Sequence, residues 1–422
     1  MALQRRLNRI DAFAIAMGGV IGVGVFRNTG LVLRGTGSFA AATALWVAVG
    51  IVGLAGATLY ADLSGRVPEA GGPYAYVRTA FGRRAGFAYG WMNGGVAIPG
   101  RQAAALAVIG ELLSRWLPGD SRVWAVAVLI VLLGLNLLGV RAGALAQRVF
   151  TTGKLATIVL VSGLALVLAV RGSAESTAAI ESASFATALG AAWYTYLGWQ
   201  DTVLLAEELK EPRRDLPVVL IGTVAAVMVA YISIHVAIYT GLHGDAAAYD
   251  KLPALAVAER ALGAAGGTLL TALMLSSMVG GAAEHLMVRP RILMALARDG
   301  LAPRPLAAVG ETGAPYGAMI GHAAIALVLV ATGSFAELVG LLAFAQGFLG
   351  IFETASYFVV RRKRPELPTS RFHPWAPIAF IAASATLCTL AAIADPVRAG
   401  VAVAALALLA AIYALGSPRA DQ

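Results

Sequence analysis

Residues 18–24 read GGVIGVG and lie inside the first apolar stretch of the chain. Glycine is common where membrane helices pack closely, but four glycines in seven residues exceed what packing requires. Such a run leaves helical geometry at little energetic cost. The amides and carbonyls that a break exposes then need partners in a cavity lined by protein. The run therefore predicts an interrupted membrane helix.

A second interruption is predicted in residues 193–201, WYTYLGWQD, where polar and aromatic residues and Gly198 divide another apolar stretch. Gly22 and Gly198 are 176 residues apart, close to the offset between two five-helix blocks of the chain. Interrupted segments at corresponding positions of two halves point to a transporter binding site. We expect inverted repeats over residues 11–171 and 184–361, followed by two helices over 375–415. The repeats follow from layout alone, because the halves share no residue-level identity.

The composition indicates one transmembrane domain over residues 1–422. The chain is 59% hydrophobic and 13% charged, whereas soluble domains are about 25% charged. Its length accommodates about twelve spans of roughly 20 residues, the third over Ala85–Leu113 and the eighth over Gly266–Ile292. The only cysteine, Cys388, excludes a disulfide within the chain. The five histidines are scattered, so neither a structural metal nor a cofactor is expected.

The distribution of positive charge predicts the orientation. With the N-terminus inside, 22 of the 32 Lys and Arg residues fall in cytoplasmic segments, 7 in outer segments and 3 within spans. This bias predicts a multi-pass protein of the cell membrane with both termini cytoplasmic. The net charge of +9 is explained in the same way and does not indicate nucleic-acid binding.

Two broken helices create a site with two kinds of free backbone group. Amides at a half-helix N-terminus favour a carboxylate, and carbonyls at the other broken end favour an ammonium group. Together they suit a zwitterion, so an amino acid is the expected substrate. A channel would need a filter or a charge ring, and a membrane enzyme would need a clustered catalytic set. A transporter-like sensor stays open.

The chain resembles the amino acid–polyamine–organocation permeases over nearly its whole length. The resemblance is carried by five segments in the family's order: GVIGVGVF at 19–26, PEAGGPYAY at 68–76 with AFG at 80–82, GW at 198–199 with AEELKEPRRDLP at 206–217, RILMALARDG at 291–300, and RRKRPE at 361–366. It implies an all-α, LeuT-like fold of five plus five inverted-repeat helices, with helices 1 and 6 unwound and two helices added.

The resemblance also implies site residues. The substrate carboxylate is expected on four backbone amides, those of Ile21, Gly22, Val23 and Gly24. Many relatives have Ser or Thr where this chain has Val23, so a hydroxyl contact is absent. The ammonium group is expected on carbonyls around Gly198, those of Tyr194, Thr195 and Leu197. The Tyr194 ring corresponds to an aromatic gate, with ordinary packing as the alternative.

Several ionisable residues fall within predicted spans, where charge is expensive and indicates function. Lys154 matches a family lysine whose ammonium group replaces a sodium ion, which implies proton linkage; snorkelling to the headgroups is the alternative. Glu284 and His285 form a candidate proton relay, or else pair with an arginine or line a watery cavity. Four further residues are left without an assigned role: Arg27, Arg101, Asp201 and Glu353.

The predicted function is secondary transport of amino acids by alternating access, with neutral amino acids favoured. Proton symport and amino acid exchange both fit, and sodium coupling is disfavoured if Lys154 fills the cation place. Arg27 leaves an acidic substrate open, and Asp201 leaves cationic amino acids or polyamines open. No P-loop of the GxxxxGK[ST] type is present for ATP drive. The segment Ser114–Arg122 has no cysteine, so no disulfide-linked partner is expected there.

Overall fold

The computed structural model describes residues 3–22, 24–171, 184–242, 245–249, 252–332, 335–367 and 370–416. Within these ranges the protein is helical and has no β-strand; Leu7 and Leu209 form an isolated parallel bridge. The all-α expectation is therefore confirmed for the described part of the chain.

The helices of the first half follow the expected order. They are α1 (Arg9–Val20), α2 (Gly24–Thr36), α3 (Phe39–Arg66), α4 (Pro73–Gly90), the π-helix η1 (Trp91–Ala97), α5 (Ile98–Leu113), α6 (Ser121–Leu137) and α7 (Val140–Arg171). The second half has α8 (Phe185–Tyr196), the 3₁₀-helix η2 (Trp199–Leu205), α9 (Pro212–Leu242), η3 (Ala246–Tyr249), α10 (Pro253–Val288), α11 (Arg291–Arg298), η4 (Arg304–Ala307), α12 (Tyr316–Thr332), α13 (Phe335–Lys363), α14 (Trp375–Ala394) and α15 (Pro396–Gly416).

Six helices of the described residues are long and apolar enough to cross a membrane, and α1 with α2 makes a seventh if the bent pair is one span. The expected count of about twelve stays a prediction. Two spans begin earlier than predicted, at Pro73 and Pro253. Each contains a glycine that leaves helical geometry, Gly82 with φ 88° and Gly263 with φ 65°. The apolar pattern therefore resumes only after the kink, which moved the predicted start towards the C-terminus.

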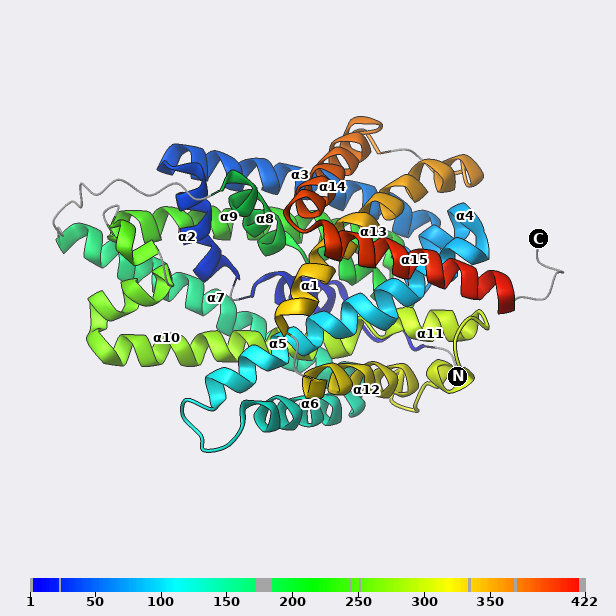
Figure 1. The fold of residues 1–422 in the computed structure, drawn as a ribbon, viewed down its shortest axis with the longest axis horizontal. Helices are drawn as coiled ribbons and strands as arrows, with labels where there is room; N and C mark the ends of the chain where they lie inside the picture. Colours follow the sequence, from blue (N-terminus) through cyan, green and yellow to red (C-terminus); the bar gives the residue numbers. More distant parts are fainter. Residues whose placement is uncertain are drawn as a thin grey trace.

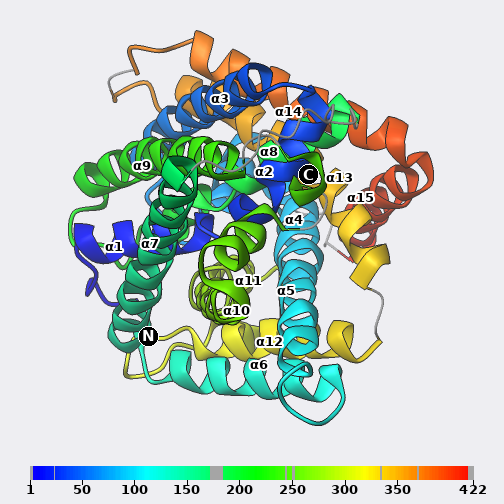
Figure 2. The same cartoon turned by 90° about the vertical axis from the view of Figure 1, so that its left-hand side faces the viewer.

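The broken helices lie in the middle of the bundle (Figures 1 and 2). Helix α1 packs against α7, α9 and α10, and α2 packs against α8. Small residues allow the last approach: a Cβ on Gly35 of α2 would lie 2.5 Å from the Cβ of Ala188 on α8. Long helices α3 and α9 pack together beside this centre. Side chains from α7, α9 and α10 can therefore reach the breaks.

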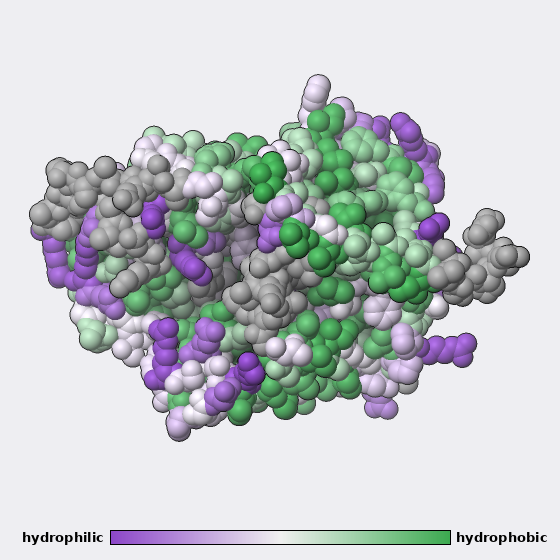
Figure 3. Space-filling model, viewed as in Figure 1, coloured by the Kyte–Doolittle hydropathy of each residue, from purple (hydrophilic) through white to green (hydrophobic). Residues whose placement is uncertain are grey.

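The surface suits a lipid environment. Figure 3 shows apolar residues over much of the middle of one face and hydrophilic residues towards both ends of the long axis. Large apolar side chains are exposed on long helices, among them Val159, Val229 and Ile393. Exposure on this scale marks a membrane or interaction surface. Together with the apolar spans, it identifies a multi-pass membrane protein.

Candidate functional site

The first break separates α1 from α2, whose axes differ by 47°. Helix α1 ends at Val20, and Ile21 is extended with φ −73° and ψ 100°. The Ile21 amide donates to the Met17 carbonyl at 2.9 Å, so the expected role of this amide in holding a carboxylate is wrong for this conformation. Val23 lies outside the described residues. Gly24 begins α2, and the first amides of a helix have no partner within it.

Gly22 faces open space. Outside its immediate neighbours, the nearest described atom to a Cβ built on Gly22 is the Gly24 nitrogen, at 4.0 Å. An anion at this place would meet amides at the N-terminus of α2, which is a favourable site for negative charge.

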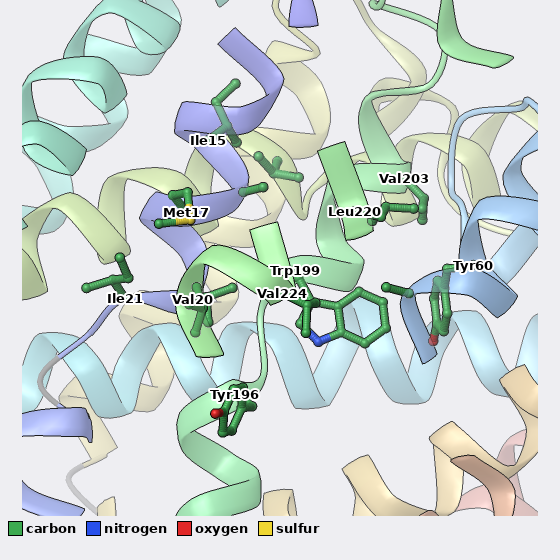
Figure 4. Close-up of a cluster of buried hydrophobic side chains, with 14 of the residues drawn as sticks. Ile15, Met17, Val20, Ile21, Tyr60, Tyr196, Trp199, Val203, Leu220 and Val224 are labelled. Carbon is green, nitrogen blue, oxygen red and sulfur yellow. The ribbon is translucent and has the colours of Figure 1, made fainter. Parts of the chain in front are cut away.

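The second break lies between α8 and η2. Leu197 is extended, with ψ 151°, and its amide donates to the Tyr194 carbonyl at 3.2 Å. Gly198 has φ +126°, in the left-handed region that favours glycine. Figure 4 shows Val20 and Ile21 close to the chain that connects Tyr196 to Trp199. The broken ends are thus neighbours in space.

The two breaks are in direct contact. A Cβ on Gly198 would lie 2.5 Å from the Gly19 carbonyl oxygen, so only glycine fits. On the other side of the break, Asn28 of α2 donates to the hydroxyl of Thr195 at 2.8 Å and to the Ala191 carbonyl at 3.2 Å. Contacts above and below therefore hold the two interrupted helices together.

Lys154 lies against the first break. Its side chain is buried, and Nζ donates to the Gly18 carbonyl at 2.5 Å. One turn earlier, Thr151 donates to the Ala14 carbonyl at 2.8 Å. A cation near a helix C-terminus is stabilised by the free carbonyls and the helix dipole. Snorkelling is the wrong alternative here, because the ammonium group points into the protein.

Glu284 of α10 is buried with its carboxylate beside the same broken helix. A Cβ on Gly19 would lie 3.2 Å from the Glu284 carboxyl carbon. One turn away, a Cβ on Gly281 would lie 3.9 Å from Lys154 Nζ. His285 Nε2 is 3.9 Å from the Glu284 carboxylate, too far for a hydrogen bond. The structure thus brings Glu284 and Lys154 to one region and leaves His285 without a direct link to Glu284.

Asp201 of η2 is paired with Arg289, at 2.8 Å, and both side chains are buried. This pairing takes up the charge on which a cationic substrate depended. Arg101 has a buried Nε without a hydrogen bond in the described part of the chain. Arg27 is exposed and no ion pair to it is found among the described residues.

Glu353 lies at a separate polar centre. It is buried on α13, and its two carboxylate oxygens accept hydrogen bonds from the hydroxyls of Tyr60 and Tyr89. Asn93 donates in turn to the Tyr89 hydroxyl at 2.9 Å. Two phenols satisfy this carboxylate, which leaves it no role in the contact between the breaks.

The two sides of the breaks differ in accessibility. All of η2 is buried, and buried Glu208 just beyond it pairs with buried Arg291. On the opposite side, the Tyr194 side chain of α8 is 62% exposed. The predicted gate residue is therefore not packed over the breaks in this conformation, and the side formed by η2 is closed.

Two residues that the sequence did not single out also contact the breaks. Asn28 bonds to α8 as described, and Tyr231 of α9 approaches carbonyls of both interrupted helices. A polar residue within an apolar stretch is a signal for both, but it is shared by many residues that only pack. The approach of α9 to both breaks is a tertiary fact that local patterns do not carry.

Comparison with known proteins gives a consistent result. The family described as "Amino acid permease" matches residues 7–415. The "Large neutral amino acids transporter small subunit 2" of Oryctolagus cuniculus is 27% identical over 434 aligned residues, covering 99% of this chain and 81% of its own. The "Asc-type amino acid transporter 1" of Mus musculus is 26% identical over 438 residues (99% and 82%). The "b(0,+)-type amino acid transporter 1" of Oryctolagus cuniculus is 25% identical over 380 residues (87% and 78%).

Proposed function

Because the chain belongs to the amino acid permease family, we propose that it moves amino acids across the membrane by alternating access at the two breaks. The observation that carries the proposal is the direct contact of the breaks at Gly198 and Gly19, beside open space at Gly22. Broken helices that meet in this way offer free amides and carbonyls at one place. The protein is a transporter and not an enzyme.

The substrate carboxylate binds the amides of Gly22, Val23 and Gly24 at the start of α2. The ammonium group binds carbonyls at the end of α8. The Tyr194 carbonyl already accepts from the Leu197 amide, and the Thr195 carbonyl accepts from Tyr231. A carbonyl oxygen has two lone pairs, so each keeps room for the ammonium group, and the Leu197 carbonyl accepts no backbone hydrogen bond from the described residues.

A neutral side chain suits this site best. Asp201 is neutralised by Arg289, and Glu284 lies in the region of Lys154. Among the described residues next to the breaks, no carboxylate is left unaccompanied by a cation to attract a cationic side chain. The printed name of the first relative, a large neutral amino acids transporter, points the same way.

Lys154 supports coupling without sodium. Its ammonium group on the Gly18 carbonyl stands where the family resemblance implies a cation. A proton on Lys154, with Glu284 as acceptor nearby, accounts for symport. Exchange of one amino acid for another needs no ion and uses the same site. His285 completes the predicted relay only through an intervening water, given its 3.9 Å separation.

The proposed architecture is that of five plus five inverted-repeat helices, 11–171 and 184–361, with helices over 375–415 added. Both termini are cytoplasmic in this arrangement. The N-terminal segment and the C-terminal end of α15 lie towards the same end of the molecule (Figure 1), as an even number of spans requires. The relative named a small subunit raises the question of a partner; Ser114–Arg122 offers no cysteine for a disulfide to one.

Uptake into proteoliposomes tests the function. We expect labelled L-leucine, L-alanine or L-serine to enter vesicles that hold the purified protein, above protein-free vesicles. Accumulation driven by an inside-alkaline pH gradient identifies proton symport, and uptake that requires preloaded amino acid identifies exchange. Binding without uptake under either condition contradicts transport and favours a sensor. Uptake of polyamines alone contradicts the amino acid assignment.

A further inference from the structure

Tyr231 lies in the middle of α9 and is fully buried. Its hydroxyl oxygen is 3.0 Å from the Val20 carbonyl oxygen and 3.1 Å from the Thr195 carbonyl oxygen. Val20 is the last residue of α1, and Thr195 is the residue before the end of α8. One phenol therefore contacts both interrupted helices at their broken ends.

Both carbonyls need a donor. The last carbonyls of a helix have no amide partner within it, and the membrane interior supplies no bulk water to replace one. A phenol carries a single donated proton. Tyr231 therefore serves two acceptors with one proton, and the nearly equal distances mean that rotation of the hydroxyl is enough to change from one to the other.

The position of the hydroxyl does not depend on its own hydrogen bonds. The Tyr231 ring packs edge-on against Tyr196, at 5.2 Å between centroids, and against Trp46, at 5.9 Å. The Tyr196 hydroxyl donates to the Trp46 carbonyl at 3.1 Å, within α3 and away from the breaks. The ring is thus held by aromatic packing, so removal of the hydroxyl leaves its surroundings in place.

We propose that Tyr231 is a positioning residue for the ammonium end of the substrate. When no substrate is bound, its hydroxyl proton is shared between the carbonyls of Val20 and Thr195. When the substrate ammonium group donates to Thr195, the Tyr231 proton passes wholly to Val20, and no buried carbonyl is left without a donor. The inference rests on the proposed function, and it adds a residue and a role that the backbone site does not contain.

This role predicts a selective defect. Without the hydroxyl, the broken ends lose the group that sets their spacing, and the ammonium group no longer meets aligned carbonyls. The carboxylate site at the start of α2 is on the other side of the breaks and keeps its amides. Loss of the hydroxyl should therefore weaken amino acids much more than analogues that lack the ammonium group.

The test compares wild type, Tyr231→Phe and Tyr196→Phe in the same proteoliposome assay. The labelled amino acid is whichever of L-leucine, L-alanine and L-serine gives the highest wild-type uptake. Competitors are the unlabelled amino acid and its analogue without the amino group: 4-methylpentanoate, propanoate or 3-hydroxypropanoate. Tyr196→Phe is a matched control, because it removes a neighbouring phenol whose hydrogen bond lies away from the breaks.

We expect Tyr231→Phe to raise the KM for the amino acid about tenfold, the loss of one buried hydrogen bond, and to leave inhibition by the analogue unchanged. The preference for amino acid over analogue then falls by the same factor, whereas Tyr196→Phe keeps the wild-type preference. Equal weakening of both competitors, an unchanged preference, or an unfolded Tyr231→Phe protein beside a folded Tyr196→Phe protein overturns the positioning role. Failure of the wild type to take up any of the three amino acids overturns the proposed function itself.

Discussion

Replacement of Gly198 by alanine is expected to reduce amino acid uptake about 100-fold or more. Two effects act at this residue. The backbone has φ +126°, a conformation in which a non-glycine residue is strained by about 1–3 kcal/mol. The added methyl group would also lie 2.5 Å from the Gly19 carbonyl oxygen, which forces the breaks apart. Because a tenfold change in rate corresponds to about 1.4 kcal/mol, these effects together are enough to stop transport.

The control for this variant is Gly190→Ala, in the same half-helix α8. A Cβ on Gly190 meets no described atom within 4 Å and the residue is helical, so alanine is tolerated there and favours the helix. Initial uptake rates of both variants, normalised to protein in the vesicles, give the comparison. Equal uptake by Gly198→Ala and Gly190→Ala would show that contact between the breaks is not needed for transport.

The second large effect is expected for Lys154→Ala. This variant removes the donor to the Gly18 carbonyl and the cation in the region of Glu284. A buried charge that loses its partner typically destabilises by about 3–5 kcal/mol. We expect uptake driven by a pH gradient to fall to about 1% of wild type, which corresponds to about 2.7 kcal/mol.

Two further variants separate coupling from general damage. Lys210→Ala removes an exposed lysine from the loop before α9 and should transport normally. The double variant Lys154→Ala with Glu284→Gln removes both charges, and should recover folding and exchange but not gradient-driven accumulation. Full gradient-driven uptake by Lys154→Ala would rule out a coupling role for this lysine.

The sequence carries the breaks because they are local. Four glycines in residues 18–24 and a glycine at 198 are backbone requirements, and the structure interrupts the chain at both places. Lys154 was equally visible, since a lysine in an apolar stretch must have a reason. What the pattern could not provide was its direction, because burial against α1 and snorkelling give the same sequence.

Other features depend on tertiary contacts and were out of reach. Asp201 attracted attention as a possible substrate contact, but its partner Arg289 is 88 positions away on another helix. Pro99 was expected to kink its helix; the structure places the π-helical turn η1 just before it. Tyr231 looks like any aromatic residue of an apolar helix until α9 is packed against both breaks.

The most direct measurement is a cryo-electron-microscopy map of the protein in lipid nanodiscs with the transported amino acid at saturating concentration. The predicted result is density between the two breaks, with the carboxylate at the amides of residues 22–24 and the ammonium group at the carbonyls of Thr195 and Leu197. Amino acid density at another place, such as the polar centre at Glu353, with none between the breaks, would contradict the central claim that the paired breaks are the substrate site.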